Sequence, residues 1–186
     1  SVGRDARFWS VRAGMSLAAD DETSLGGSLQ ERFGETGRAG MTAWSLEGAW
    51  NPFGHLALSS GLEMASVDLP GVDVQDIWTS RWSVGATHPA GPGALSLVIA
   101  QPRRAETGTI RFLAPTGIDD QGIILRSQVE AGLTPSGRQI DYETRYRFNL
   151  FGTWTGEASA ALSTSPNHIT GVADESVAWL AVGRKW

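Results

Sequence analysis

The stretch QIDYETRYRFNL, residues 139–150, decides the fold class because its side chains alternate strictly in character. One set of alternate positions is mostly apolar: Ile140, Tyr142, Thr144, Tyr146, Phe148 and Leu150. The other set is polar: Gln139, Asp141, Glu143, Arg145, Arg147 and Asn149. Successive side chains of a β-strand point to opposite faces, so this stretch predicts a strand with one apolar and one charged face.

The same alternation recurs along most of the chain. Residues 123–133 repeat it, and Pro135, Ser136 and Gly137 predict a turn between that segment and the first. Further strands are predicted at 9–17, 44–50, 56–64, 78–86 and 95–99, less regular ones at 23–33, 109–114 and 155–164, and a last one at 177–186. Because no segment has a helical period, we expect an all-β protein. Roughly eleven strands result, and the even counts of bacterial barrels favour ten or twelve.

Composition excludes several classes of protein. The 186 residues suffice for one domain, residues 1–186. A net charge of -5, with scattered arginines and Lys185 as the single lysine, argues against nucleic acid as a partner. Without cysteine there is no disulfide framework. No run approaches the ~20 apolar residues of a membrane helix, but a spanning β-strand needs only alternate apolar positions. The mean hydropathy of -0.16 therefore fits both a soluble and a membrane protein.

Two features favour a barrel over a soluble sandwich. Short connections (19–22, 51–54, 88–92, 151–154) take turns with longer ones (34–40, 67–75, 102–108, 165–175), as in outer-membrane barrels. The order is imperfect, because 134–138 is short and 115–121 is long. Charges also extend well into the strands. We therefore expect an antiparallel up-and-down transmembrane β-barrel of about 10–12 strands, with a soluble β-sandwich or barrel as the alternative.

A membrane barrel assigns each face of the strands a role. The chain contains 23 glycines, which suit turns and curved strands, and 8 tryptophans, which suit a membrane interface. The residues expected to face lipid or its interface are Trp9, Trp44, Trp78, Trp82, Tyr142, Tyr146, Phe148, Leu180 and Trp186. The residues expected to form a charge network in the lumen are Glu47, Glu63, Arg81, Arg126, Glu130, Asp141, Glu143, Arg145 and Arg147.

The two ends of the sequence suggest a processed protein. Trp186 closes an alternating segment that contains Ala178, Leu180, Val182 and Arg184. A terminal aromatic residue of this kind is similar to the signal that the barrel-assembly machinery reads, although Arg184 stands where a second aromatic is usual. The first residue is Ser1, and no signal peptide precedes the first strand. We expect the C-terminal part of a longer protein.

Three ordered motifs carry a family resemblance: LSLVIAQPR at 95–103, GLTPSGRQIDY at 132–142 and PNH at 166–168. Together they make the second half of the chain resemble the C-terminal, autotransporter-like region of envelope subtilisin-like serine peptidases. The resemblance implies an outer-membrane β-barrel that anchors or translocates an upstream protease passenger. The catalytic motifs of that family are absent from this sequence, so no enzymatic activity is expected of the segment itself.

Other candidate sites are weaker. Ser165, Asn167 and His168 supply the residue types of a hydrolase but share one loop, and Asp73 and Asp76 with His168 would be needed for an omptin-like site. The acidic groups at 20–22 and 119–120 lack calcium-loop spacing and indicate solvated turns. The glycines at 26–27 and 91–93 precede no helix that could bind a phosphate, so neither a metal nor a cofactor is expected.

The sequence therefore predicts a barrel in the outer membrane of a Gram-negative cell, with outer-membrane lipid, the assembly machinery and a protease passenger as partners. Two alternatives stay open. The first is a soluble β-rich accessory or binding module of the same protease. The second is a barrel enzyme of the omptin or lipase type.

Overall fold

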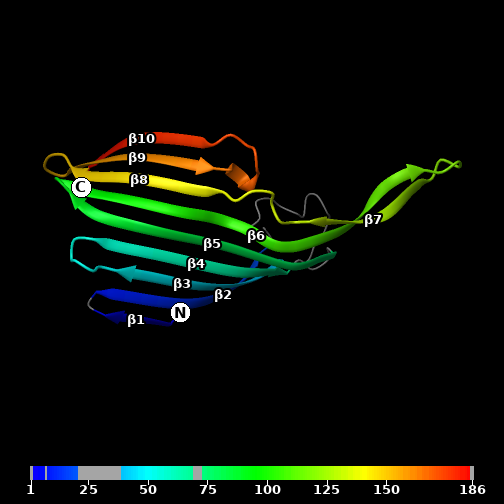
Figure 1. Ribbon diagram of the computed structural model, residues 1–186, viewed down its shortest axis with the longest axis horizontal. Coiled ribbons are helices and arrows are strands. Elements are labelled where there is room, and N and C mark those ends of the chain that lie inside the picture. The colour runs from blue at the N-terminus through cyan, green and yellow to red at the C-terminus, as the bar shows by residue number, and fades with distance from the viewer. Residues whose placement is uncertain (1, 7, 21–38, 69–72, 185–186) are drawn as a thin grey trace.

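The computed structural model describes residues 2–6, 8–20, 39–68 and 73–184. All strands within these residues belong to one antiparallel sheet (Figure 1). They are β1 (Val2–Ala6), β2 (Trp9–Asp20), β3 (Ala39–Trp50), β4 (Ala57–Asp68), β5 (Asp73–Ala90), β6 (Gly93–Ile118), β7 (Ile124–Gly132), β8 (Ile140–Asn149), β9 (Trp154–Thr164) and β10 (Glu175–Arg184). The short 3-10 helix η1 (Pro166–His168) lies between β9 and β10. The predicted all-β, up-and-down architecture is confirmed, and the described strands form no second sheet of a sandwich.

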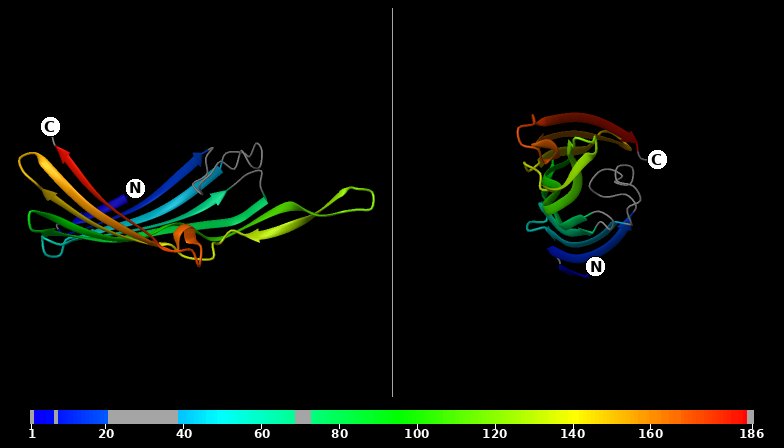
Figure 2. Two further views of the ribbon diagram at one scale, coloured as in Figure 1. Left: turned by 90° about the horizontal axis from the view of Figure 1, so that it is seen from above. Right: turned by 90° about the vertical axis from the view of Figure 1, so that its right-hand side faces the viewer.

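The sheet is open, so the predicted closed barrel is not what the described residues form. Along the sheet the order is β1-β2-β3-β4-β5-β6-β8-β9-β10, and β7 pairs with β6 off this path. Figure 2 shows the sheet curving into a trough with β1 and β10 as its two free edges. Every neighbouring pair is antiparallel, so the first and last of nine strands run in the same direction. An antiparallel ladder therefore cannot join β1 directly to β10.

Strand β6 differs most from the prediction. The predicted strands at 95–99 and 109–114 and the predicted loop at 102–108 are one continuous strand of 26 residues. Its first half pairs with β8 and its second half with β7. The register against β5 shifts between Ser80 and Trp82, which marks a β-bulge near Pro102 and Arg103. A bulge accommodates the proline without ending the strand, and this is why the loop prediction was wrong.

The second half of β6 and strand β7 form a two-stranded extension, which we call the arm (residues 109–132). Figure 1 shows the arm projecting beyond the end of the sheet. Strand β1 was not predicted, and the predicted strand at 23–33 lies outside the described residues. The predicted turn at 51–54 lies between β3 and β4, and β8 and β9 are joined by residues 150–153. These short connections lie at one end of the sheet, which we call the turn end. The other end is the loop end.

The register places the two sets of alternating residues on opposite faces of the sheet. Leu46, Leu62 and Trp82 lie opposite one another on one face, and Glu47, Gly61 and Ser83 lie on the other. We call the first the apolar face and the second the polar face. The buried hydrophobic side chains of the described residues are few and mostly small: Ala43, Ala65, Ile77 and Ala105. A conventional hydrophobic core is therefore absent from the part of the chain that the structure describes.

Candidate functional site

The apolar face is broad, continuous and exposed. In the described strands it carries large hydrophobic side chains across the whole sheet, from Val11 on β2 to Leu180 on β10. Leu97 at the centre is 51% exposed, and Leu180 near the free edge is 72% exposed. Monomeric soluble proteins rarely expose contiguous apolar patches above a few hundred Å². This face therefore requires an apolar environment or a covering partner.

Charge is segregated between the two faces. The polar face of the described strands carries Arg12, Glu47, Glu63, Arg81, Arg103, Asp141, Glu143, Arg145, Arg147, Glu157 and Glu175. On the apolar face of the strands from β2 to β10, β7 aside, acidic and basic residues lie near the two ends, among them Arg104 and Glu106 at the loop end and Arg184 at the turn end. On the edge strand β1, the register places Arg4 on the apolar face at the level of Val84. A band without acidic or basic groups therefore runs across the middle of this face from β2 to β10.

Aromatic residues flank this band. Trp9 and Trp50 pair across β2 and β3 at the turn end, while Trp44 and Trp78 stack at 5.7 Å between ring centroids nearer the loop end. On β4 the residues opposite Trp50 and Trp78 are Leu58 and Ser66. These two positions are separated by about 26 Å along the strand at 3.3 Å per residue. Aromatic girdles around an apolar band about 25 Å tall are the pattern of outer-membrane barrels.

The predicted lipid-facing residues that can be located all lie on this apolar face. By register, this holds for Trp9, Trp44, Trp78, Trp82, Tyr142, Tyr146, Phe148 and Leu180. Trp186 lies outside the described residues. The structure brings them onto one surface but does not place that surface in a membrane, so lipid contact stays a prediction.

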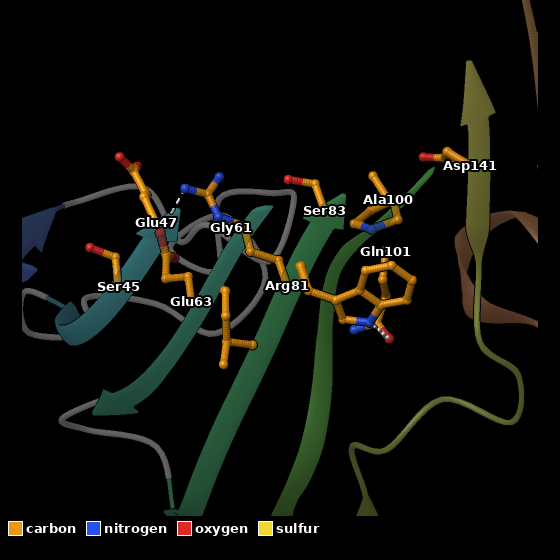
Figure 3. Close-up of a pocket in the computed structure, with 12 residues that line it drawn as sticks. Ser45, Glu47, Gly61, Glu63, Arg81, Ser83, Ala100, Gln101 and Asp141 are labelled. Atoms are coloured by element: carbon orange, nitrogen blue, oxygen red, sulfur yellow. Dashed lines mark hydrogen bonds and ion pairs between the residues drawn. The ribbon is translucent and has the colours of Figure 1, made fainter. Parts of the chain in front are cut away.

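The polar face is hollowed across strands β3, β4, β5, β6 and β8. The hollow has a volume of about 530 Å³ and is lined by Glu47, Glu63, Arg81, Ser83 and Asp141 among others (Figure 3). It spans several neighbouring strands, as the concave side of a curved sheet does (Figure 2). Of the predicted charge network, Glu47, Glu63, Arg81 and Asp141 are thus brought to one cavity.

Glu63 is the centre of the charge network in this hollow. It forms an ion pair at 2.6 Å with Arg81 on the neighbouring strand and a second ion pair with Arg103, which reaches across β5 from β6. Arg103 also donates a hydrogen bond to Thr79, whose side chain is buried. The side chains of Glu63 and Arg103 are only 14% and 19% exposed. The pairing therefore contributes more than a fully solvated ion pair does.

A second charge network lies on the same face of β8 and β9. Arg147 donates to Glu157 at 2.7 Å, and Arg145 contacts both Glu143 at 2.5 Å and Glu157 at 3.5 Å. These contacts join charges of opposite sign on adjacent strands. The alternation of β8 predicted Glu143, Arg145 and Arg147, but Glu157 was missed because β9 is otherwise rich in alanine and serine.

The remaining predicted network residues have other surroundings. Asp141 accepts a hydrogen bond from Gln139 at 2.8 Å and one from Ser163 on β9. Glu130 pairs with Arg111 at 2.8 Å on the arm. Arg126 is also on the arm and is exposed. The structure therefore places Arg126 and Glu130 outside the hollow.

Polar residues also gather on the apolar face at the loop end, where two loops fold over β6. We call residues 133–139 and 165–170 the strap. Arg104 donates to the backbone carbonyls of Pro135 and Gly137 at 3.1 and 3.0 Å and pairs with Glu106 at 2.5 Å. Arg138 of the strap pairs with the same Glu106 at 3.0 Å and donates to Gln101. The two arginines therefore share one carboxylate, and neutral carbonyl and amide oxygens are their other acceptors.

The two strap loops approach each other closely at Gly137. Its N–H donates to the carbonyl of His168 at 2.7 Å, and a Cβ atom at this position would lie 2.8 Å from the backbone nitrogen of Thr170. Only glycine fits this approach. The motifs at 95–103, 132–142 and 166–168 thus meet in the strap although they are far apart in sequence.

His168 joins the two loops to β6. Its side chain is 7% exposed. Nδ1 accepts the N–H of Gln139 at 2.8 Å, so Nε2 carries the proton and donates to the carbonyl of Arg103 at 3.1 Å. Burial lowers the pKa of His168 below 6.5, and the nearby Arg104 and Arg138 lower it further, against an opposing effect of the Arg103 carbonyl and Asp141. The imidazole is therefore held neutral, with both nitrogens bonded to backbone.

A lowered pKa of His168 makes stability fall in acid. The unfolded chain binds a proton near pH 6.5 and the folded chain only at lower pH, so stability decreases as pH falls through 6.5. The variant His168→Gln keeps a donor at the Nε2 position and should lose this part of the dependence. The measurement is the denaturation midpoint between pH 7.5 and 5.5, with the exposed His88→Gln as control. A wild-type slope retained in His168→Gln would contradict the assignment.

The catalytic alternatives find no assembled site among the described residues. His168 has both ring nitrogens bonded to backbone groups. The N–H of Asn167 donates to Gln139, and the N–H of Ser165 donates to Asp174. Asp76 lies at the loop end of β5, where its carbonyl accepts a hydrogen bond from Thr107. Nothing can be said of the side chain of Asp73.

Comparison with known proteins adds no identification. No protein-family model, no curated protein and no solved structure matches the chain. Among the described residues, no helix has the length and hydropathy needed to cross a bilayer. No group of three histidine or acidic side chains in the described ranges is arranged to hold a metal ion.

Sequence reasoning missed part of both polar clusters. Arg103, Arg104 and Glu106 fell within a segment that was predicted to be a loop. Residues 103–108 read Arg-Arg-Ala-Glu-Thr-Gly and carry no regular apolar alternation, so the sequence gives no local signal that the strand continues through them.

Proposed function

We propose that this chain is the membrane-embedded β-sheet of an outer-membrane barrel in a Gram-negative envelope. The apolar face would contact the hydrocarbon of the bilayer, and the polar face would line the interior. In this proposal the domain anchors, or helps to export, an upstream serine-protease passenger. The domain itself acts physically and carries out no chemical step.

The segregation of charge is the observation that supports the proposal most strongly. Membrane barrels alternate lipid-facing apolar residues with lumen-facing polar ones along every strand. From β2 to β10 the middle of the apolar face carries no acidic or basic group, while the polar face carries ion pairs such as Glu63–Arg81 and Arg147–Glu157. A water-soluble sheet that needed its apolar face for a core would pack that face against a second layer. Here the large side chains of that face are exposed.

The hollow would be a filled interior rather than an open channel. Small barrels are filled by their own side chains. Arg103 and Glu63 cross the polar face between β6 and β4, and Arg81 closes the same cluster from β5. Free diffusion of solutes through such an interior is not expected.

The passenger part of the proposal rests on the resemblance of the motifs at 95–103, 132–142 and 166–168. Their residues meet in the strap through His168, Gly137 and Arg104. These contacts support a common architecture at the loop end and do not identify the passenger.

Fractionation of a Gram-negative host tests the proposal. The chain, secreted with a cleavable signal and an upstream reporter domain, should sediment with the outer membrane, resist urea washing and require detergent for release. The reporter should be cleaved by protease added outside intact cells. Recovery of the chain in the soluble periplasmic fraction would refute membrane insertion. A membrane-bound chain whose reporter stays protected would refute the export role alone.

A further inference from the structure

The arm carries a strand edge with which no described strand pairs. Beyond the residues that pair with β5, the arm is only two strands wide, and it projects past the loop end of the sheet (Figure 1). Exposed apolar side chains lie along it, among them Leu113 at 67% and Leu125 at 50% exposure. A two-stranded ribbon is only marginally stable in water, and an open strand edge is a template for pairing with another strand. A further strand along the arm would therefore stabilise it.

The backbone of β7 shows that its outer edge can accept such a strand. The N–H of Leu133 donates to the carbonyl of Gly108 at 2.9 Å. Backbone groups alternate in direction along an antiparallel strand, so the even-numbered residues of 126–132 point theirs away from β6. On the opposite edge of the arm the same alternation puts Pro115 of β6 among the outward positions, and proline has no N–H to donate. Strand β7 contains no proline, so its edge is the open one.

The charges of β7 match those of a second copy of the same strand. Gln128 is the middle residue of β7, and Arg126 and Glu130 lie two residues to either side of it on one face. In an antiparallel pair of β7 strands centred on Gln128, each Arg126 lies directly opposite Glu130 of the other copy. Arg126 is exposed and has no ion pair among the described side chains, and Glu130 is 52% exposed. Pairing of two copies would give each Arg126 a counter-charge.

Other registers lose this match. A pair centred on Arg126 would set two arginines opposite each other, and a pair centred on Glu130 would set two glutamates opposite each other. A centre one residue to either side of Gln128 sets one of the charges opposite this neutral side chain and shortens the ladder. The centre at Gln128 pairs the whole of β7 and, on the other face, sets Leu125 beside Ala131 of the other copy.

We propose that β7 is a self-association site, at which the arms of two copies pair in antiparallel fashion about Gln128 into a four-stranded sheet. Such an interface uses the same surface on both copies. Because each arm projects past the loop end, the two sheets extend away from the paired arms in opposite directions (Figure 1). The setting rests on the proposed function: with the loop end outside the cell, the arms connect two facing outer membranes.

One pair of arms binds weakly, and many pairs bind strongly. Nine residues from each copy bury far less than the ~1,600 Å² of a standard interface. Dilute copies in detergent micelles are therefore expected to be monomeric. Two facing membranes hold many arms at high local concentration, and multivalent binding then raises the overall affinity. The contact is accordingly one between surfaces.

Clustering of phosphatidylcholine vesicles that carry several copies each tests the charge match, with turbidity as the measurement. Vesicles with the wild-type chain should cluster. Arg126→Glu and Glu130→Arg should each weaken clustering by about tenfold or more, because each sets like charges opposite one another. Mixing vesicles of the two variants should restore clustering, since the two negative side chains of one copy then face the two positive ones of the other.

A proline at the centre of β7 tests the strand edge itself. Gln128→Pro removes an outward N–H and leaves the hydrogen bonds between β7 and β6 in place, so it should abolish clustering while the arm stays folded. Gln128→Ala keeps the N–H and is the matched control, which should cluster like the wild type. Sedimentation with the vesicles checks that every variant is inserted.

Single cysteines test the register, because the chain has no cysteine of its own. Gln128→Cys should form a disulfide between copies in clustered vesicles, since residue 128 lies opposite itself at about 5.5 Å between Cα atoms. Ser127 lies opposite Val129 of the other copy, whereas the two copies of residue 127 are diagonal neighbours about 7–8 Å apart. Ser127→Cys and Val129→Cys should therefore cross-link efficiently when mixed and poorly when alone.

The outcomes separate the self-association from the proposed function. Inserted wild-type chain that does not cluster vesicles overturns the self-association, and so does clustering that neither charge reversal nor Gln128→Pro weakens. Disulfides from Ser127→Cys alone at the yield of the mixture overturn the register. Cross-linking through residue 128 within separate, unclustered vesicles would place both copies in one membrane and overturns the end-to-end arrangement.

Failure of the chain to enter vesicles would refute the proposed membrane function alone. The self-association is then measured by sedimentation of the concentrated chain in water. Dimers that each charge reversal weakens and that the mixture of both variants restores would support the β7 edge. Monomers at every concentration would overturn it.

Discussion

Replacing Val84 with arginine is expected to destabilise the chain in a bilayer by about 2–4 kcal/mol, the cost of a basic side chain near the midplane of a membrane barrel. Val84 is 46% exposed and lies on the apolar face between Ser60 and Ile99. In a water-soluble sheet the same exposed substitution would change stability by no more than about 0.5 kcal/mol. The measurement is urea unfolding from phospholipid vesicles, followed by tryptophan fluorescence.

The matched control is Ser83→Arg, one residue earlier on β5. Ser83 lies on the polar face opposite Gly61 and Ala100 and lines the hollow. It should cost much less than Val84→Arg, because an arginine there joins Glu47 and Glu63 in a polar surrounding. Equal losses for the two variants, or no loss for either, would contradict the assignment of the faces.

Replacing Glu63 with glutamine should produce the second large effect, a loss of about 2–3 kcal/mol. The glutamine keeps the shape but leaves Arg81 and Arg103 without a counter-charge, and removing one partner of a buried pair costs about 3–5 kcal/mol. The lower figure reflects the partial exposure of Arg81, whose side chain is 58% exposed. Chemical denaturation in detergent micelles measures the loss.

The double variant Glu63→Gln with Arg103→Gln tests the physical reason. It should recover part of the stability, since it removes the uncompensated cation together with its former partner. Glu130→Gln is the control, because the Arg111–Glu130 pair on the arm is exposed and should contribute less than about 1 kcal/mol. Additive losses in the double variant would argue against a coupled cluster at Glu63.

The alternation along the predicted strands was sufficient to predict the strand class, which residues share a face and most of the charged residues of the polar face. These properties follow from the period of two in a strand, which depends only on local geometry. The same period of two predicts that Trp44, Trp78 and Tyr142 share one surface. The structure confirms that surface through the register of β3, β5 and β8.

The open sheet, the arm and the strap could not be predicted in this way. Each depends on pairing between distant residues. The partners of β6 change from β8 to β7 along its length, and no local pattern specifies that change. His168 lies in a turn in which Ser165, Asn167 and His168 have left-handed backbone conformations. The sequence PNH alone does not predict this conformation. Its contacts with Arg103 and Gln139 come from tertiary packing.

Cysteine scanning along β5 tests the central claim most directly, because the chain has no cysteine of its own. Single cysteines at residues 79–86 would each carry a fluorophore in vesicle-refolded protein, and a nitroxide on the lipid chains would quench it. We predict quenching with a period of two: strong at Trp82, Val84 and Ala86, and weak at Arg81, Ser83 and Gly85. Uniform accessibility of both sets to a water-soluble quencher, without this alternation, would contradict a sheet with one face in lipid.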